Sequence, residues 1–111
     1  MEGKETENKE TEKQDFLLYE LEKPVTFEQA GISRIDLRKL REMTLKDLSE
    51  LYDTYAAFGE SEGVMQECSL KFVRLLMQRA TGYPLEALNK IGMRDAVRLK
   101  ARVYRFFYLS K

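Results

Sequence analysis

The sequence predicts an α+β domain in which an N-terminal antiparallel β-hairpin packs on a small bundle of about four helices. Residues 16–38 are rich in strand-forming side chains with partial period-two alternation, and residues 44–109 carry apolar side chains at helical spacing. A chain of 111 residues supports one domain. Neither a hairpin nor a single helix can bury its apolar face alone, so we expect both parts to share one core.

The hairpin is predicted from two short segments around a turn. Residues 16–22 are apolar and aromatic, residues 25–27 have strand-forming side chains, and residues 32–38 alternate apolar and polar side chains. Pro24 interrupts the first segment, and because it has no N–H to donate we expect it at an edge or a bulge. A bulge would also reconcile Ile32 and Ile35, which are three residues apart. Residues 28–31 are predicted to form the turn.

Two long helices are predicted after residue 43. The first begins at Thr44, where Thr44-x-x-Asp47 resembles a capping box, and ends at Gly59. Residues 60–63 are predicted to form a loop. The second runs from about residue 64 to residue 81, and Gly82 is a natural C-cap.

A short third helix and a long fourth helix complete the prediction. Pro84 suits the first position of the short helix, which ends near Gly92. The last helix spans about residues 93–109. Asp95 lies in its first turn, where a negative charge suits the helix dipole.

The composition excludes several classes of chemistry. The chain has no His, which removes His general bases, His-paired nucleophiles and His-ligated metal sites. Its one Cys, Cys68, cannot form an intrachain disulfide, and its place on an apolar helix face favours a buried, inert thiol. The six glycines form no phosphate-binding loop. We therefore expect a protein that is not an enzyme, with no catalytic residue, no cofactor and no metal site.

The charges balance over the whole chain but not along it. There are 19 basic and 19 acidic side chains. Residues 1–15 are acidic and Lys-rich and are almost free of apolar side chains, so we predict a disordered tail there and a single domain over residues 16–111. The segment 89–111 is basic, with Asp95 as its one acid. No segment resembles a signal peptide or a membrane-spanning helix, so we expect a cytoplasmic protein without membrane contact.

The last helix carries the candidate binding residues. On a helical wheel, Arg94, Arg98, Arg102 and Arg105 form one stripe, and apolar side chains cover more than half of the circumference. Its aromatics are either part of the core or contacts for a partner helix. The candidate partner-binding residues are Arg98, Arg102, Arg105, Tyr104, Phe107 and Tyr108.

The arginine stripe leaves three interpretations open. A solvated polar face is the ordinary one, an acidic protein partner is the second, and nucleic acid is the third. The zero net charge and the pI of about 6.4 disfavour a dedicated nucleic-acid domain. A dimeric interaction module that buries the final aromatics between two copies is a further alternative.

The order of several motifs resembles one family. Its most specific part is Ala-Thr-Gly at residues 80–82, followed by Pro84-Leu-Glu-Ala-Leu88 and by Arg94-Asp95-Ala96 at the start of the last helix. These follow Leu21-Glu-Lys-Pro-Val25, Ile35-Asp-Leu-Arg38 and Thr44-Leu-Lys-Asp-Leu48. In this order, over about residues 17–107, they resemble the tail assembly chaperones of Mu-like and P2-like contractile-tailed phages.

This resemblance implies a function without chemistry. Such a chaperone would be made in an infected or lysogenic bacterium and would bind the long, helical tape-measure protein before the tail tube polymerises. The resemblance also implies that related phages make a longer form by ribosomal frameshifting. It carries over no partner-contacting residue, because its motif positions look structural.

Overall fold

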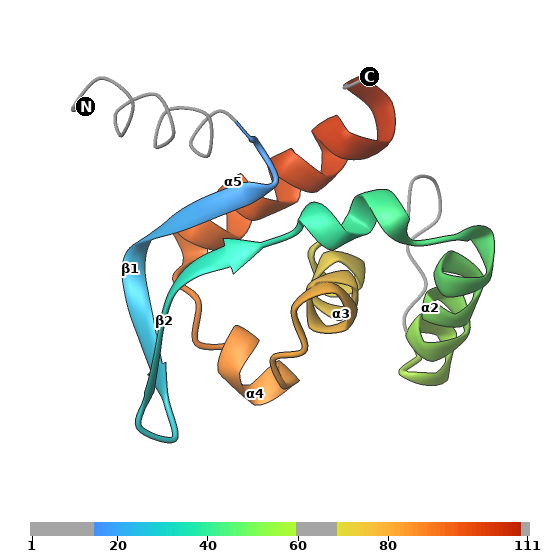
Figure 1. Cartoon of the computed structure of the whole chain (residues 1–111). Helices are drawn as coiled ribbons and strands as arrows, with labels where there is room; N and C mark the ends of the chain where they lie inside the picture. Colours follow the sequence, from blue (N-terminus) through green and yellow to red (C-terminus); the bar gives the residue numbers. More distant parts are fainter. Residues whose placement is uncertain (1–14, 60–68, 110–111) are drawn as a thin grey trace.

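The computed structural model describes residues 15–59 and 69–109, and it confirms the predicted α+β class (Figure 1). In these residues an antiparallel hairpin precedes four α-helices. The elements are β1 (Leu18–Phe27), β2 (Ala30–Asp36), the 3-10 helix η1 (Arg38–Glu42), α2 (Leu45–Ala57), α3 (Leu70–Thr81), α4 (Leu85–Leu88), α5 (Met93–Tyr104) and the π-helical turn η3 (Arg105–Leu109). The predicted disordered tail, apart from Asp15, and the predicted loop at residues 60–63 lie outside the described residues.

The hairpin contains the bulge that its sequence predicts. Glu20 faces Arg34, but the next pair is Val25 with Ile32, so β1 holds four residues between these pairs where β2 holds one. Pro24 lies in this irregular stretch, where it costs no ladder hydrogen bond. The bulge bends β1 and leaves backbone N–H groups free to bind elsewhere.

The turn of the hairpin is shorter than predicted. Glu28 and Gln29 have left-handed φ angles of 50° and 69°, and Ala30 already pairs with Phe27. Positive φ at both central residues is typical of a two-residue type I′ turn. Gly31, which was expected in the turn, therefore lies in β2. The left-handed positions are occupied by Glu28 and Gln29 instead, although glycine adopts this backbone conformation at a lower cost in free energy.

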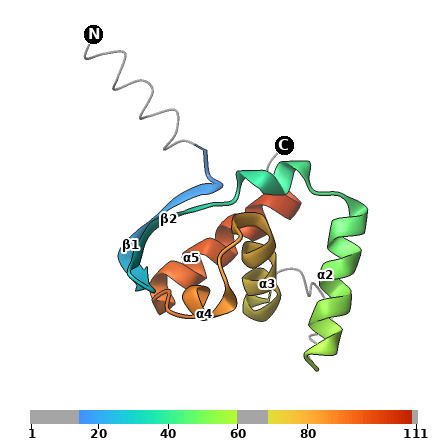
Figure 2. The same cartoon turned by 60° about the horizontal axis from the view of Figure 1, so that its bottom comes forward.

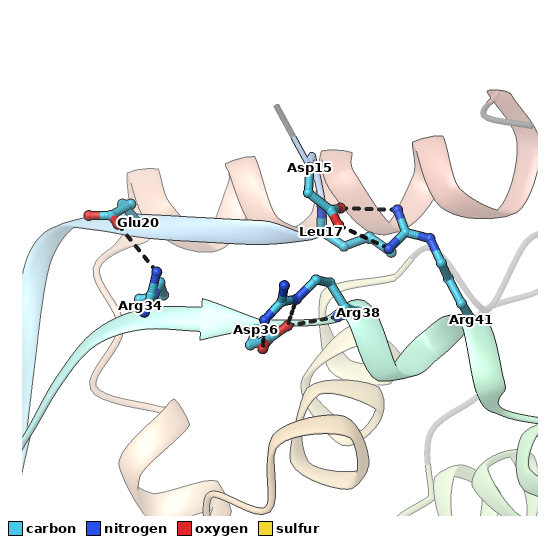
Figure 3. Close-up of polar contacts among 7 residues, drawn as sticks. All are labelled: Asp15, Leu17, Glu20, Arg34, Asp36, Arg38 and Arg41. Atoms are coloured by element: carbon cyan, nitrogen blue, oxygen red, sulfur yellow. Dashed lines mark hydrogen bonds and ion pairs between the residues drawn. The ribbon is translucent and has the colours of Figure 1, made fainter. Parts of the chain in front are cut away.

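Ion pairs fasten the start of the domain to the segment after β2 (Figure 3). The Asp15 carboxylate accepts hydrogen bonds from Arg41 Nη1 and Nη2 at 3.1 Å and 3.0 Å, and from the backbone N–H of Leu17 at 3.1 Å. The bond from Arg41 is the main cause that lowers the pKa of Asp15. Asp36 makes a similar fork with Arg38, at 2.9 Å and 2.8 Å.

The helix η1 is an element that the sequence analysis does not predict. Its one buried side chain is Leu40, which joins the core beside Leu37. The backbone N–H of Leu37 donates to the carbonyl of Leu17 at 2.7 Å, so the chain leaves β2 still bonded to β1. A single buried leucine among charged residues gives no helical period to detect.

The helix ends mostly follow the predicted capping signals. Thr44 and Asp47 form the predicted capping box of α2, and Gly82, at φ 84°, is the left-handed C-cap of α3. The start of α3 is later than predicted, because the Ser69 side chain caps the helix by accepting from the N–H of Phe72 at 3.1 Å. Pro84 is the N-cap of α4 and not its first helical residue.

The helix α3 lies at the centre of the molecule (Figures 1 and 2). It contacts η1, β2, α2, α4 and α5, and five of its side chains are buried. The hairpin crosses α5 on one side, and α2 lies on the opposite side of α3. Arg79 of α3 reaches α2 through Asp47 at 2.8 Å and Glu50 at 2.6 Å. The core is therefore shared between the hairpin and the helices, as expected.

Candidate partner-binding surface

One edge of α5 is fixed in the core. Leu99 and Val103 are completely buried, and the helix contacts both β1 and α3. The chain continues without a break into η3, where Phe106 and Phe107 pack against the same core. The remaining sides of α5 determine what the helix can offer to a partner.

The arginine side of α5 packs along β1. Arg102 Nη1 donates to the carbonyl oxygen of Phe16 at 2.8 Å, and its guanidinium lies 4.9 Å from the centroid of the Tyr19 ring. The Arg105 guanidinium lies 4.2 Å from the centroid of the Phe16 ring. These are hydrogen-bond and cation–π contacts between the last helix and the start of β1.

The two earlier arginines of the stripe reach one glutamate. Arg94 Nη1 lies 3.2 Å from Glu22 Oε2, and Arg98 Nη1 lies 3.6 Å from Glu22 Oε1. All four arginines of the predicted stripe thus contact β1 or Phe16, which lies two residues before it. Arg94, Arg98 and Arg105 are nevertheless exposed, so this row of arginines faces solvent while it also makes contacts across to β1 and Phe16.

The carboxylate of Asp95 is the buried centre of this contact. Asp95 is 2% exposed and accepts three hydrogen bonds, from Tyr19 Oη at 2.6 Å and from the backbone N–H groups of Glu22 and Lys23 at 2.9 Å and 3.1 Å. The two N–H groups belong to the bulge of β1. Burial raises the pKa of Asp95, but the three hydrogen bonds outweigh it and the pKa is lowered. The pKa of Tyr19 is raised, first by burial and then by this bond.

Sequence reasoning assigns Asp95 only a role at the helix start. The structure adds that it joins α5 to β1, more than 70 residues away in sequence. The one relevant signal is Pro24, which predicts a bulge and therefore unpaired N–H groups, although it does not identify their acceptor.

The opposite side of α5 presents an exposed apolar surface. Met93, Val97, Tyr104 and Tyr108 are 85%, 57%, 38% and 46% exposed, and Ala101 is also exposed. At about 100° per residue these five side chains share one helix face, which we call the α5 stripe. The rings of Tyr104 and Tyr108 lie 5.2 Å apart between centroids. A continuous exposed apolar face marks a candidate site for a protein partner.

The rim of the α5 stripe is basic. Arg94 and Arg105 flank one edge and Lys100 flanks the other, since they lie next to the stripe at about 100° per residue. The only acid in α5 and η3 is the buried Asp95. The electrostatics therefore favour a partner with acidic side chains beside its own apolar face.

The structure separates the six predicted candidate residues into two groups. Tyr104 and Tyr108 lie in the α5 stripe, and Arg105 lies at its rim. Arg98 and Arg102 hold α5 to β1, and Phe107 packs at the edge of the core with its ring 5.3 Å from that of Phe106. Met93 and Val97 are absent from the predicted set, although the same helical wheel places them beside Tyr104.

Two apolar pockets flank the helix. One, of about 220 Å³, lies between α3, α4 and the start of α5, with Val73, Met77 and Ala96 in its wall. The other, of about 210 Å³, lies between η1, α2 and η3, with Leu40, Leu45 and Phe107 in its wall. Each is smaller than the ~300–1,000 Å³ of a typical small-molecule site.

The described parts of the chain show no constellation for metal chemistry. Within residues 15–59 and 69–109, no three acidic or Cys side chains converge where they could hold a metal ion. Among those same residues, no helix is both long and apolar enough to cross a membrane.

Comparison with known proteins decides the family. A family model described as phage tail assembly chaperone proteins, E, or 41 or 14, matches residues 18–108. The chain belongs to this family. The resemblance seen in its motifs is thereby confirmed, and membership implies a non-catalytic role in tail assembly alongside a protein partner. The matched segment contains the whole of β1, the Asp95 contact and the α5 stripe of the chaperone. No curated protein and no solved structure gives a significant match.

Proposed function

We propose that this chaperone binds the tape-measure protein through the α5 stripe, without covalent chemistry, in the cytoplasm of the phage's bacterial host. The observation that carries the proposal is the α5 stripe, an exposed apolar face on a helix whose Leu99 and Val103 side is buried in the core. A chain that belongs to a tail assembly chaperone family needs such a surface for a helical, aggregation-prone client.

The proposal assigns different tasks to the predicted candidate residues. Tyr104 and Tyr108 contact the client directly, and Arg105 contributes charge at the rim. Arg98 and Arg102 position α5 on β1, and Phe107 holds η3 against the core. Amphipathic tyrosines and arginines are enriched at the centres of protein interfaces, which fits this arrangement.

Co-expression with the tape-measure protein of the same phage tests the proposal. The wild-type chaperone should keep the tape-measure protein soluble and co-purify with it at both moderate and high salt, because an apolar contact is screened little. Val97→Glu should lower this capture at least tenfold by placing a charge in the stripe. Phe58→Glu is the matched control, since Phe58 is a 52% exposed side chain at the end of α2.

The outcomes separate the remaining alternatives. A folded chaperone that leaves the tape-measure protein insoluble contradicts the proposal. If Val97→Glu instead converts a dimer to a monomer without affecting capture, the stripe serves self-association. Capture of nucleic acid that is lost at high salt would indicate the arginines as a phosphate-binding surface.

A further inference from the structure

The pocket between α3, α4 and α5 is lined by Arg74, an arginine that forms no ion pair with an acidic side chain of the described residues. Arg74 Nη1 donates to Asn89 Oδ1 at 3.0 Å, but Arg74 Nε is buried and has no hydrogen-bond partner. Arg74 is half-buried and its acceptor, Asn89 Oδ1, belongs to a neutral amide, so the outer part of its guanidinium remains able to bind a carboxylate from outside the chain.

The walls around Arg74 are apolar. Val73, Met77, Leu88 and Ala96 line the pocket, and the cationic Lys71 also borders it. Ala96 lies on α5 between the buried Leu99 and the exposed Met93, so the pocket lies beside the N-terminal end of the α5 stripe. A partner that covers the stripe therefore passes this pocket.

The size of the pocket indicates what can enter it. Its volume of about 220 Å³ exceeds the ~150 Å³ of an apolar cavity that holds benzene. It is below the ~300–1,000 Å³ that drug-sized ligands occupy. One large apolar side chain fits these limits better than a free small molecule does.

We propose that this pocket takes one large apolar side chain of the tape-measure protein, and that a carboxylate close to that side chain pairs with the Arg74 guanidinium at the pocket wall. This inference rests on the proposed function and adds a recognition element to it. The client segment would carry Leu, Met or Phe with an Asp or Glu beside it on the same helix face. Arg74 would then bind the carboxylate through a charge-assisted bond.

A pair of small probes tests the chemistry of the pocket directly. Methyl NMR spectra of the full-length chaperone are recorded with 3-phenylpropionate and with its neutral amide, at millimolar concentrations. The propionate should shift the methyl signals of Val73, Met77 and Leu88 at lower concentration than the amide. Arg74→Met should remove the difference between the two probes. Shifts that are absent, or equal for both probes, overturn the proposal.

Variants of the pocket test the role of the client. Arg74→Met and the pocket-filling Ala96→Leu should each weaken tape-measure binding about tenfold, whereas Arg34→Met, which removes a hairpin arginine, should not. Equal capture by wild type, Arg74→Met and Ala96→Leu overturns the pocket proposal and leaves the proposed function intact. A folded wild-type chain that captures no tape-measure protein overturns both. If Arg74→Met fails to fold, the capture of the tape-measure protein by Ala96→Leu alone decides whether the pocket proposal holds.

Discussion

Tyr19 Oη donates a 2.6 Å hydrogen bond to Asp95 Oδ1 and so joins the first strand to the first turn of the last long helix. The same carboxylate accepts the N–H groups of Glu22 and Lys23, which the bulge around Pro24 leaves without strand partners. The position of α5, and of the stripe on its outer face, therefore depends on one buried acid.

Removing this acid should destabilise the fold strongly. Asp95→Asn places an amide N–H₂ opposite a backbone donor, so we expect a loss of about 2–4 kcal/mol in the free energy of unfolding. Tyr19→Phe removes one bond to the carboxylate and should cost about 1.5–3 kcal/mol. Urea denaturation of both variants measures these losses. Unchanged midpoints would show that the hydrogen bonds contribute little.

Acid should weaken the same contact. Because the pKa of Asp95 is lowered in the folded state, its contribution is present above the unfolded pKa of about 4 and is lost as the pH falls through the folded pKa. The stability difference between wild type and Asp95→Asn should therefore be largest above about pH 5 and shrink below about pH 4. Denaturation at several pH values measures it, and a constant difference would contradict the prediction.

Arg102 should behave as a structural residue. Arg102→Met loses the bond to the Phe16 carbonyl and the contact over Tyr19, so we expect a loss of about 1–2 kcal/mol in the free energy of unfolding. Arg94→Met, at an exposed position, should change it by less than about 0.5 kcal/mol. Thermal unfolding followed by circular dichroism compares the two. Equal effects would mean that the burial of Arg102 against β1 is unimportant.

The hairpin turn offers a stabilising change. Glu28 and Gln29 both adopt left-handed φ angles, which an Asn-Gly pair adopts at lower cost. The double variant Glu28→Asn/Gln29→Gly should gain about 1 kcal/mol in the free energy of unfolding. Gly31→Ala, within β2, is a control for composition and should not show this gain. A destabilised double variant would argue against a type I′ turn.

Two substitutions, one in α5 and one in η3, should separate the candidate partner surface from the core. Val97→Glu, in the α5 stripe, should change the free energy of unfolding by less than about 0.5 kcal/mol, because Val97 is 57% exposed. Phe107→Asp should cost about 2–4 kcal/mol, since Phe107 packs against the core and lines the pocket beside η1. Urea denaturation of each purified variant measures both. Equal losses would indicate that Val97 also belongs to the core.

Local signals predicted much of this fold. The capping box of Thr44 and Asp47 and the C-cap at Gly82 are formed by residues close together in sequence, so a pattern can reveal them. The bulge at Pro24 is likewise local, because proline removes a donor wherever it stands. The helix η1 escaped prediction because Leu40 alone anchors it.

The site was predictable only in part. The helical wheel places Tyr104 and Tyr108 on one face, but only the packing of Leu99 and Val103 shows that this face points outward. Periodicity could not show what the arginines of α5 contact, because their contacts lie at the other end of the chain, on β1 and on Phe16 just before it. Contacts between segments far apart in the chain produce no characteristic spacing of residues, so a sequence pattern does not reveal them.

The bond between the bulge of β1 and Asp95 has a consequence for synthesis on the ribosome. The hairpin emerges first, but the acceptor for its N–H groups is translated more than 70 residues later. Domains generally fold as units during synthesis, and long-range contacts form late. The nascent chaperone therefore completes its core only after α5 has left the exit tunnel, and the α5 stripe takes its final position in that same step.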